Sequence, residues 1–493
     1  MKEYGLYIDG KWVKSSSGKT FETKNPATGE TLAVISEGGR EDTARAIDAA
    51  ERAFPKWKKC PPPKRAEILL KAAMILRERK QELAETVTKE MGKVIAEGKG
   101  DVQEGIDFFE YISGEGRRMF GETTTSELQN KFCMTVRQPI GIVGCIAPWN
   151  FPMAIPCWKL GAVFMAGNTA VFKPATLTPL CLAKLAEVFE AAGLPPGVLN
   201  VVPGPADTVG REILENPKVN VISFTGGVET GKEIYARAAK GLKHVGLELG
   251  GKNPLIVMDD ANLDLAVDGV LFAAFGTAGQ RCTATSRLII QEKVYDVVME
   301  KLLARTKALK LGNPLDPKID VGPVASEQQE KNILNYIKIG VEEGAKLICG
   351  GKKLTGGEYD KGFFIQPTIF EAKHGMRITK EEIFGPVLCV MKAKDYDEAV
   401  HIANDVEYGL SSSIYTRNVN LAFRAVEDLQ AGITYINAPT IGAEVHLPFG
   451  GVKHTGNGAR EAGTSAIEEF TEIKTVYIDY SDKLQKAQID THG

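Results

Sequence analysis

The chain of 493 residues has few of the features that mark disulfide-stabilised, metal-binding or nucleic-acid-binding proteins. Its eight cysteines include no CxxC pair and no close cluster, which fits neither a disulfide framework nor a metal site and favours a reducing compartment. The six histidines include no HExxH motif. A formal charge of -3 creates no field that would attract nucleic acid or an anionic membrane. We therefore expect no metal, no nucleic acid and no membrane among its partners.

The sequence also shows no secretory signal, because no apolar stretch precedes the first charges, and we expect the protein to be cytoplasmic. The uncharged stretch between Arg137 and Lys159 is long enough to suggest a membrane span, but it holds four prolines. Prolines there would leave backbone groups unpaired in lipid, so we expect a buried strand, a loop and the start of a helix. The runs Lys56 to Lys59 and Pro61 to Pro63 predict a solvated loop between two helices.

The length corresponds to roughly three domains of ordinary size. Residues 41–112 carry apolar residues at helical spacing and predict a helical layer. From about residue 140, short apolar runs alternate with helical stretches, and a second such series begins at Pro254. This alternation predicts an α/β fold with two doubly wound parallel-sheet domains. In such sheets ligands bind beyond the carboxyl ends of the strands, so the chemistry is sought in the loops there.

Two motifs suggest chemistry that the surrounding residues do not support. Gly226 to Lys232 matches the GxxxxGK part of a phosphate loop, but Glu233 stands where a Ser or Thr would bind magnesium. NTP hydrolysis is therefore disfavoured, although the turn can still bind a phosphate through backbone N–H groups. His244 and Glu248 would share one face of a strand, but no third ligand accompanies them.

Cys282, in GQRCTATSR, is the best candidate for a nucleophile. It follows a glycine-containing loop, and the neighbouring Arg281 could favour the thiolate. A lone cysteine is more often a small buried hydrophobe. Two further residues strengthen the catalytic interpretation: Glu248 could act as a general base, and the Asn150 amide could donate to an oxyanion.

Taken together, nine strings resemble the aldehyde dehydrogenase superfamily in order and spacing. They are IDGKWV, FETKNPATGE, APWNFP, FKPA, SFTGG, LELGGKNP, GQRCTATSR, EEIFGPV and PFGGVKHTG, and they cover nearly the whole chain. The resemblance implies a Rossmann-like cofactor domain over residues 1–113 and 139–248 and a catalytic domain over 249–450. It also implies a small β oligomerisation extension over 114–138 and 466–493, and a homo-oligomer, either a dimer or a tetramer.

For the reaction, the resemblance implies that Cys282 adds to an aldehyde to give a thiohemiacetal, which Asn150 and the Cys282 backbone N–H stabilise. Hydride transfer to the nicotinamide then gives a thioester, and Glu248 activates the water that releases the acid. Lys159 matches a family lysine with a supporting proton-relay role.

The resemblance assigns ten residues to NAD(P) binding: Trp149, Lys173, Thr176, Gly204, Gly226, Gly227, Thr230, Leu249, Glu382 and Phe384. Gly227 stands where the family commonly has Ser. Thr176 stands where NAD-specific members tend to have Glu, so no carboxylate would repel a 2′-phosphate. We therefore predict that NADP is accepted, and preferred over NAD.

The substrate is predicted less directly. Phe151, Trp158 and Phe449 would line an apolar tunnel, with Arg281 and Thr283 beside the nucleophile, although Trp158 is equally explicable as a core aromatic. The two arginines of succinate semialdehyde enzymes are replaced by Trp158 and Gly276. The string beginning IGAEVHLPFGG and the C-terminal region most resemble α-ketoglutarate semialdehyde dehydrogenases. Aminoadipate-type semialdehyde, glyceraldehyde 3-phosphate and broad aldehydes remain alternatives.

Three rival functions have specific objections. An acylating, coenzyme A-dependent relative would lack Glu248, and an ATPase is opposed by Glu233. A noncatalytic structural relative would not need Cys282, Glu248 and Asn150 together.

Overall fold

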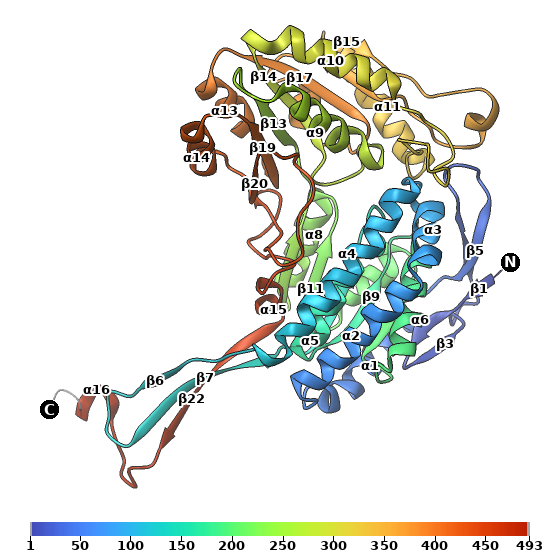
Figure 1. Ribbon diagram of the computed structural model, residues 1–493. Coiled ribbons are helices and arrows are strands. Elements are labelled where there is room, and N and C mark those ends of the chain that lie inside the picture. The colour runs from blue at the N-terminus through green and yellow to red at the C-terminus, as the bar shows by residue number, and fades with distance from the viewer. Residues whose placement is uncertain (1, 491–493) are drawn as a thin grey trace.

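The computed structural model describes residues 2–490, which form two α/β units and a long β arm (Figure 1). The two units lie one above the other in Figure 1, and the arm extends away from the lower one. The predicted α/β class with two doubly wound sheets is confirmed.

The lower unit is built on a seven-stranded sheet in the order β12-β11-β8-β9-β10-β2-β3. Its parallel strands are β8 (Ile142–Ile146), β9 (Thr169–Lys173), β10 (Leu199–Val201), β11 (Val219–Thr225) and β12 (His244–Glu248). Sequence alternation did not reveal the antiparallel edge, formed by β2 (Leu6–Ile8) and β3 (Lys11–Val13). Because the chain proceeds from β8 in both directions, the strand order reverses there, and loops after β8 and β11 flank a crevice suited to a ligand.

Helices cover both faces of this sheet. One face holds α5 (Ala154–Ala166) and α6 (Pro179–Ala192), and beyond them lie α2 (Pro62–Glu78), α3 (Lys80–Met91) and α4 (Ile95–Ser113). The other face holds α1 (Arg40–Trp57), α7 (Arg211–Glu215) and α8 (Val228–Ala239). The helices predicted over residues 41–112 correspond to α1 to α4, but they do not form one layer, because α1 lies on the opposite face of the sheet from α2, α3 and α4. Beside this unit, β1 (Lys2–Tyr4), β4 (Thr20–Lys24) and β5 (Thr31–Ser36) form a small sheet.

The upper unit has its own seven-stranded sheet, in the order β15-β16-β17-β14-β13-β19-β20. The strands are β13 (Asn253–Val257), β14 (Thr285–Gln291), β15 (Lys346–Cys349), β16 (Thr368–Glu371), β17 (Val387–Ala393), β19 (Ser411–Tyr415) and β20 (Ile433–Ile436). Only β15 runs antiparallel to its neighbour. One face is covered by α9 (Leu263–Phe275), α10 (Tyr295–Ala308) and α11 (Glu327–Glu342), and the other by α13 (Tyr396–Asn404) and α14 (Val419–Asp428).

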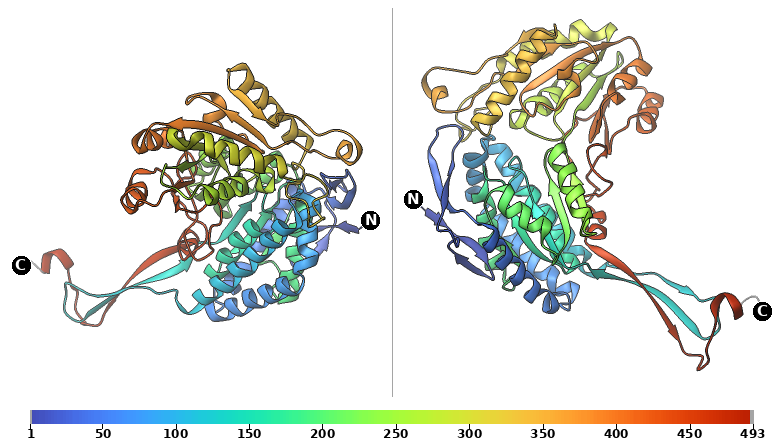
Figure 2. Two further views of the ribbon diagram at one scale, coloured as in Figure 1. Left: turned by 45° about the horizontal axis from the view of Figure 1, so that its top comes forward. Right: turned by 180° about the vertical axis from the view of Figure 1, so that it is seen from behind.

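The arm consists of β6 (Thr123–Thr125), β7 (Lys131–Pro139) and β22 (Thr471–Asp479), with the short α16 (Ala487–Asp490) at its tip. β22 pairs antiparallel with β7 along its whole length. Figure 2 shows that the arm stands clear of both units in every view. The last three residues of the predicted oligomerisation segment, 491–493, lie outside the described residues.

Candidate active site

Cys282 lies in a tight turn just before β14. The turn includes Thr277 and Ala278, both in the left-handed region with φ of 53° and 52°. Non-glycine residues rarely adopt this conformation, and such strain concentrates at functional sites. The carbonyl of Cys282 accepts a hydrogen bond of 2.7 Å from Asn253 Nδ2 at the start of β13. In the upper unit the candidate nucleophile therefore lies at the amino ends of the strands, whereas the loop of Asn150 follows the carboxyl end of β8 in the lower unit.

Asn150, in the loop after β8, contacts the same turn from the lower unit. Its Nδ2 donates to the carbonyl of Gln280 at 3.1 Å, and its Oδ1 is buried without a partner. The amide N–H predicted to hold an oxyanion thus lies against the loop that carries Cys282. Sequence reasoning placed Asn150 and Cys282 in one site, and the structure brings the two loops into contact.

The Cys282 thiol lies in an electrostatic environment that opposes its ionisation. Burial raises the pKa of Cys282 to about 12, and the carboxyl groups of Glu382 and Glu248 act in the same direction. The structure does not bear out our expectation that Arg281 would favour the thiolate. Its guanidinium is held by Glu97 Oε1, at 2.9 Å, and by the Thr277 hydroxyl, also at 2.9 Å. The charge of Arg281 is therefore neutralised by a neighbouring carboxylate.

Glu248 is the last residue of β12 and is almost fully buried. Within residues 2–490, neither of its carboxyl oxygens has a hydrogen-bond partner. Burial raises the pKa of Glu248 well above its usual value, and the nearby Glu461 and Glu469 raise it further. A buried carboxyl with free oxygens and a raised pKa is suited to taking a proton from a thiol or a water molecule.

A buried acid–base cluster lies behind Glu248. Lys159, on α5, forms an ion pair with Glu461, and its Nζ also donates to the Ser223 hydroxyl at 2.9 Å. Glu469 has both carboxyl oxygens buried and without a partner. Burial and the charge of Glu461 raise the pKa of Glu469 to about 8. Sequence reasoning found Lys159 but missed both glutamates, although Glu461 lies within one of the strings that carried the resemblance.

The cluster shares one face of the lower sheet with Glu248. Side chains two residues apart on a strand point to the same face, so Gly246 and Glu248 face the same side. Gly246 is paired with Ser223 on β11, whose hydroxyl accepts from Lys159. A side chain at position 246 would displace the Glu469 carboxyl, because a Cβ there would lie 1.6 Å from its Oε1.

Two of the predicted cofactor residues line a cavity of about 320 Å³ at the carboxyl ends of β8, β9 and β11, whose lining also includes Asp207 and Glu233. Lys173 and Thr230 line it, together with Arg211 and Arg237, which the sequence reasoning missed. Lys173 is buried with only the Pro174 carbonyl at 3.2 Å as a partner, and burial lowers the pKa of Lys173 to about 8. Thr176 lies in the exposed turn just beyond, outside the lining. A buried amine without a carboxylate partner is suited to an anionic ligand.

The turn at Gly226 and Gly227 leads into α8. Gly227 is the N-cap of this helix, and the space where a Cβ would stand is empty. The backbone N–H groups of the first helical turn are therefore open to an anion. Leu249 packs against α8, where a Cβ on Gly231 would lie 2.5 Å from its side chain. Gly204 allows a close backbone contact, because a Cβ there would lie 2.4 Å from the Gly38 carbonyl.

The predicted nicotinamide side lies between the two units. Glu382 Oε1 accepts from the Gly251 N–H at 2.9 Å, and burial raises the pKa of Glu382 to about 7. The rings of Trp149 and Phe384 meet edge to face, with centroids 5.4 Å apart. Phe384 has a φ of 58°, a second strained position at this site.

The predicted substrate residues form two groups. Phe151 lies between two cations, with Lys93 Nζ 3.7 Å and the Arg281 guanidinium carbon 5.4 Å from its ring centre. Trp158 is 5% exposed and packs against Phe449, with ring centroids 5.2 Å apart. Thr283 is half-buried, and its carbonyl accepts from the Thr440 hydroxyl at 2.7 Å. Arg281 faces Glu97, as described above.

Within residues 2–490, no helix is long and apolar enough to cross a membrane, and no group of His, Cys, Asp and Glu side chains could hold a metal ion.

Two doubly wound sheets, a cysteine just after a strained segment, a buried carboxyl and a crevice where the strand order reverses are typical of an oxidoreductase that uses a nicotinamide cofactor. Residues 12–476 match the model of the "Aldehyde dehydrogenase family". The chain belongs to this family and is an NAD(P)-dependent aldehyde dehydrogenase.

Two curated relatives match nearly the whole chain. The α-ketoglutaric semialdehyde dehydrogenase of Bacillus subtilis (strain 168) is 44% identical over 96% of this chain and 98% of its own length. The α-ketoglutarate semialdehyde dehydrogenase of Haloferax volcanii is 42% identical over the same shares.

Solved structures agree with this assignment. An NADP-dependent enzyme of E. coli matches with a TM-score of 0.94 and 39% identity, covering 97% of this chain and 98% of that one. Betaine aldehyde dehydrogenase of Staphylococcus aureus, in complex with NAD+, matches with a TM-score of 0.95 and 34% identity, covering 98% and 95%.

Proposed function

We propose that Cys282 is the nucleophile that oxidises a semialdehyde to a carboxylic acid, with Glu248 as its general base. The observation that carries this proposal is the pair of free, buried carboxyl oxygens on Glu248, close enough to Cys282 to raise the pKa of its thiol. No structural ion pair or hydrogen bond accounts for this carboxyl, so its burial without partners suits a group reserved for proton transfer.

In the first step, the Cys282 thiol gives its proton to Glu248 and the sulfur adds to the aldehyde carbon. The new oxyanion accepts hydrogen bonds from Asn150 Nδ2 and the Cys282 backbone N–H. The addition makes the aldehyde carbon tetrahedral, and only then can its hydrogen leave as hydride. An oxidised nicotinamide, held by Glu382 and Phe384, would supply the hydride acceptor and a positive charge that favours the thiolate.

Before the second step, Glu248 must release the proton that it took from the thiol. It then takes a proton from water, whose oxygen attacks the thioester at Cys282. The C–S bond breaks, the thiolate is regenerated and the acid leaves. Glu248 must then pass on its proton, and the Lys159–Glu461 pair with Glu469 lies on the same face of the sheet to receive it. We infer that this cluster determines whether Glu248 is protonated at the start of each turnover.

For the cofactor, we propose that NADP is preferred over NAD. Lys173 and Arg211 line the cavity beside the turn of Thr176, and none of the ion pairs of the described residues involves Lys173. Arg211 is only loosely paired, 3.9 Å from Glu215. A 2′-phosphate would thus meet two available cations and no carboxylate at position 176. Of the two acidic residues that line the cavity, Glu233 is paired with Arg237, and Asp207 is the other.

We propose α-ketoglutarate semialdehyde as the substrate, because both curated relatives are named for it. The aromatic side chains of Phe151 and Phe449 would contact its carbon chain. Arg281, which directly precedes Cys282 in the sequence, is the candidate that would bind the anionic end of this substrate. It can bind a carboxylate only by sharing or releasing Glu97. Broad aldehyde oxidation is the alternative that this ion pair favours.

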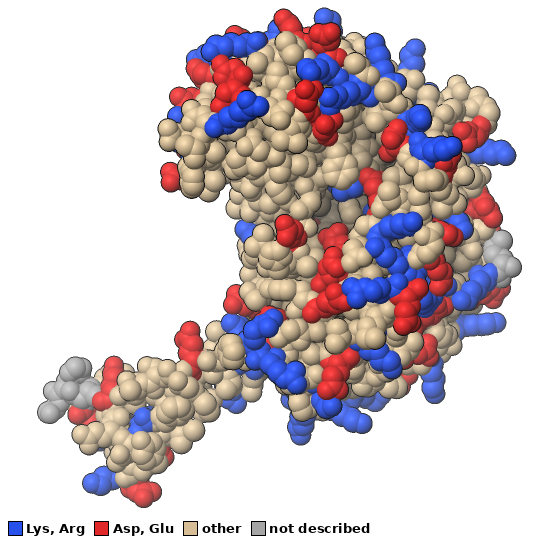
Figure 3. Space-filling view, in the orientation of Figure 1, with Lys and Arg blue, Asp and Glu red and all other residues tan. Residues whose placement is uncertain are grey.

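We further propose that the protein is a cytoplasmic homo-oligomer assembled through the arm. All eight cysteines are free, in keeping with a reducing compartment. The arm exposes Ile473 (64%) and Tyr477 (66%), and Figure 3 shows that its surface carries few charges. An isolated hairpin of this kind is marginally stable, so a second copy is its natural partner. Light scattering after size exclusion should give a dimer or tetramer, and a monomer would contradict the proposal.

The reaction is tested by mixing the protein with NADP or NAD and a panel of semialdehydes and simple aldehydes while following reduced nicotinamide. We expect turnover that falls at least about 10³-fold in Cys282→Ala. Undiminished turnover in that variant would remove the proposed nucleophile. A higher kcat/KM for simple aldehydes than for α-ketoglutarate semialdehyde would overturn the substrate alone.

A further inference from the structure

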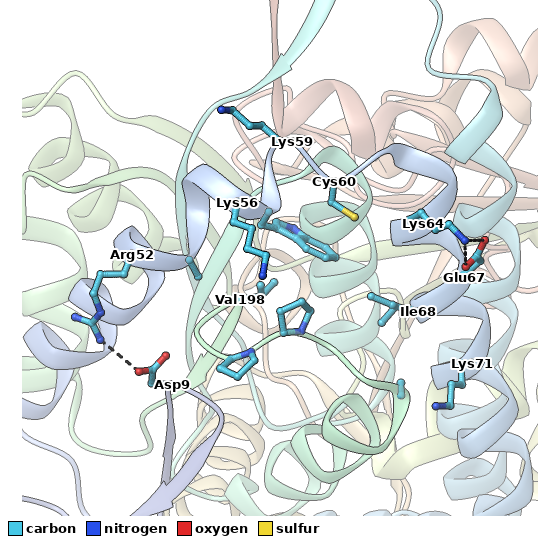
Figure 4. A pocket seen from close by; sticks show the side chains of 15 residues that line it. Asp9, Arg52, Lys56, Lys59, Cys60, Lys64, Glu67, Ile68, Lys71 and Val198 are labelled. Atoms are coloured by element: carbon cyan, nitrogen blue, oxygen red, sulfur yellow. Dashed lines mark hydrogen bonds and ion pairs between the residues drawn. The ribbon is translucent and has the colours of Figure 1, made fainter.

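A second cavity, of about 800 Å³, lies on the lower unit away from the candidate active site (Figure 4). Its walls are the end of α1, the start of α2 and the segment from Ala192 to Val198 that joins α6 to β10. It shares no lining residue with the cofactor cavity. Its volume is within the range of small-molecule sites. We expected a solvated loop at Lys56 to Lys59, but Lys56 and Trp57 belong to the last turn of α1 and help to form this cavity.

The cavity is strongly basic. Five lysine or arginine side chains line it, against Asp9 and Glu67 as the acidic ones. Both carboxylates are already used, because Asp9 pairs with Arg52 at 3.5 Å and Glu67 with Lys64 at 2.9 Å. Among the described residues, Lys56, Lys59 and Lys71 have no ion-pair or hydrogen-bond partner, so three positive charges remain uncompensated around one cavity.

Two of these lysines face the cavity from opposite sides. In Figure 4 the Lys56 ammonium points inward toward Val198 and Lys71 approaches from the α2 side, whereas Lys59 extends outward from the rim. The negative end of the α1 dipole accounts for a cation at Lys56, but not for Lys71, which lies in the middle of α2. Helix stability alone therefore does not explain the arrangement.

The rest of the lining is apolar. Trp57, Ile68, Val198 and the consecutive Pro195 and Pro196 contribute to it. The indole N–H of Trp57 is buried and lacks a hydrogen-bond partner. The two proline rings and the aliphatic lining between two separated cations suit a ligand with an apolar body and several negative charges.

We propose that this cavity binds an organic polyanion of the nucleoside polyphosphate class, with the phosphates between Lys56 and Lys71 and the base on the apolar lining. The site is separate from catalysis and does not rest on the proposed reaction. Lysine ammonium groups bind phosphate as point charges, so binding should weaken as salt rises.

The test is photolabelling with 8-azido-ATP, followed by digestion after glutamate and peptide mass spectrometry, because the label reports where the nucleotide lies. In the wild type we expect label on peptides from residues 52–71 or 192–198, saturable and competed by ATP. In Lys56→Ala/Lys71→Ala the apparent Kd for that label should rise at least tenfold, with turnover unchanged as evidence of intact folding.

The matched control is Lys14→Ala/Lys99→Ala, which removes two exposed lysines outside the cavity and should leave the labelling as in the wild type. Label confined to the cofactor crevice, or equal labelling of the Lys56/Lys71 variant, would overturn the proposal. Competition by tripolyphosphate as strong as that by ATP would also overturn it, because the apolar lining would then contribute nothing.

Discussion

Glu469 can approach the catalytic strand only because position 246 is glycine: a Cβ on Gly246 would lie 1.6 Å from its Oε1. Glu248 lies two residues further along the same strand and on the same face. A second buried, unpartnered carboxyl is therefore packed beside the proposed general base. Like charges so placed cannot both ionise easily, which is why Glu469 raises the pKa of Glu248.

Replacing Glu469 with Gln should move the pH dependence of kcat to lower pH. The neutral amide removes a negative neighbour, so the pKa of Glu248 falls and the base becomes available at lower pH. The effect should be largest above pH 8, because the pKa of Glu469 is about 8 and its charge is present only above that value. Steady-state rates across pH measure the shift. The control Glu468→Gln alters an exposed neighbour that pairs with Arg137 and should not shift the profile. Identical profiles for Glu469→Gln and the wild type would exclude this coupling.

Replacing Glu248 with Gln should stop the cycle at the thioester. Steady-state turnover should fall about 10²- to 10⁴-fold, the usual contribution of a general base. Rapid mixing should show a slower burst of up to one reduced nicotinamide per active site, because Glu248 also takes the thiol proton in the first step. Hydroxylamine attacks a thioester without a general base and should restore turnover. A variant without a burst that hydroxylamine fails to rescue would place Glu248 in the first step alone.

Replacing Asn150 with Ala should lower kcat/KM about 10²- to 10³-fold through loss of an oxyanion donor. Because Asn150 also bonds to Gln280 in the Cys282 turn, a shifted cysteine could produce a similar loss. The rate at which iodoacetamide alkylates Cys282 separates the two, since it needs no oxyanion donor. Equal slowing of alkylation and turnover would assign Asn150 to positioning only.

Replacing Thr176 with Glu should reverse the proposed cofactor preference. The new carboxylate would repel a 2′-phosphate, so the ratio of kcat/KM for NADP to that for NAD should fall at least tenfold. The control Thr176→Gln adds similar bulk without charge and should change the ratio much less. The proposal fails if the unaltered protein already uses NAD with equal or greater efficiency.

The sequence predicted those features that short local motifs determine. Loops such as APWNFP and GQRCTATSR carry Asn150 and Cys282, and the alternation of elements predicted the two sheets that bring these loops together. It could not predict contacts between distant segments that share no motif. Glu469 can lie near Glu248 because Gly246 has no side chain to occupy the space. Arg281 is paired with Glu97, which lies on α4, far earlier in the chain. The antiparallel edge strands β2, β3 and β15 were missed because a short apolar run does not reveal the direction of its pairing.

The position of Glu469 also connects two parts of the molecule that seem unrelated. It is the last residue of α15 (Ser465–Glu469), and β22, the long strand of the arm, begins two residues later at Thr471. β7, the partner of β22, leads through Pro139 into β8 and the loop of Asn150. The arm is thus anchored by two strands whose inner ends continue into the residues proposed for proton transfer and oxyanion binding. Assembly through the arm would hold the inner ends of β7 and β22 in place. The quaternary structure would then also support the position of the residues proposed for catalysis.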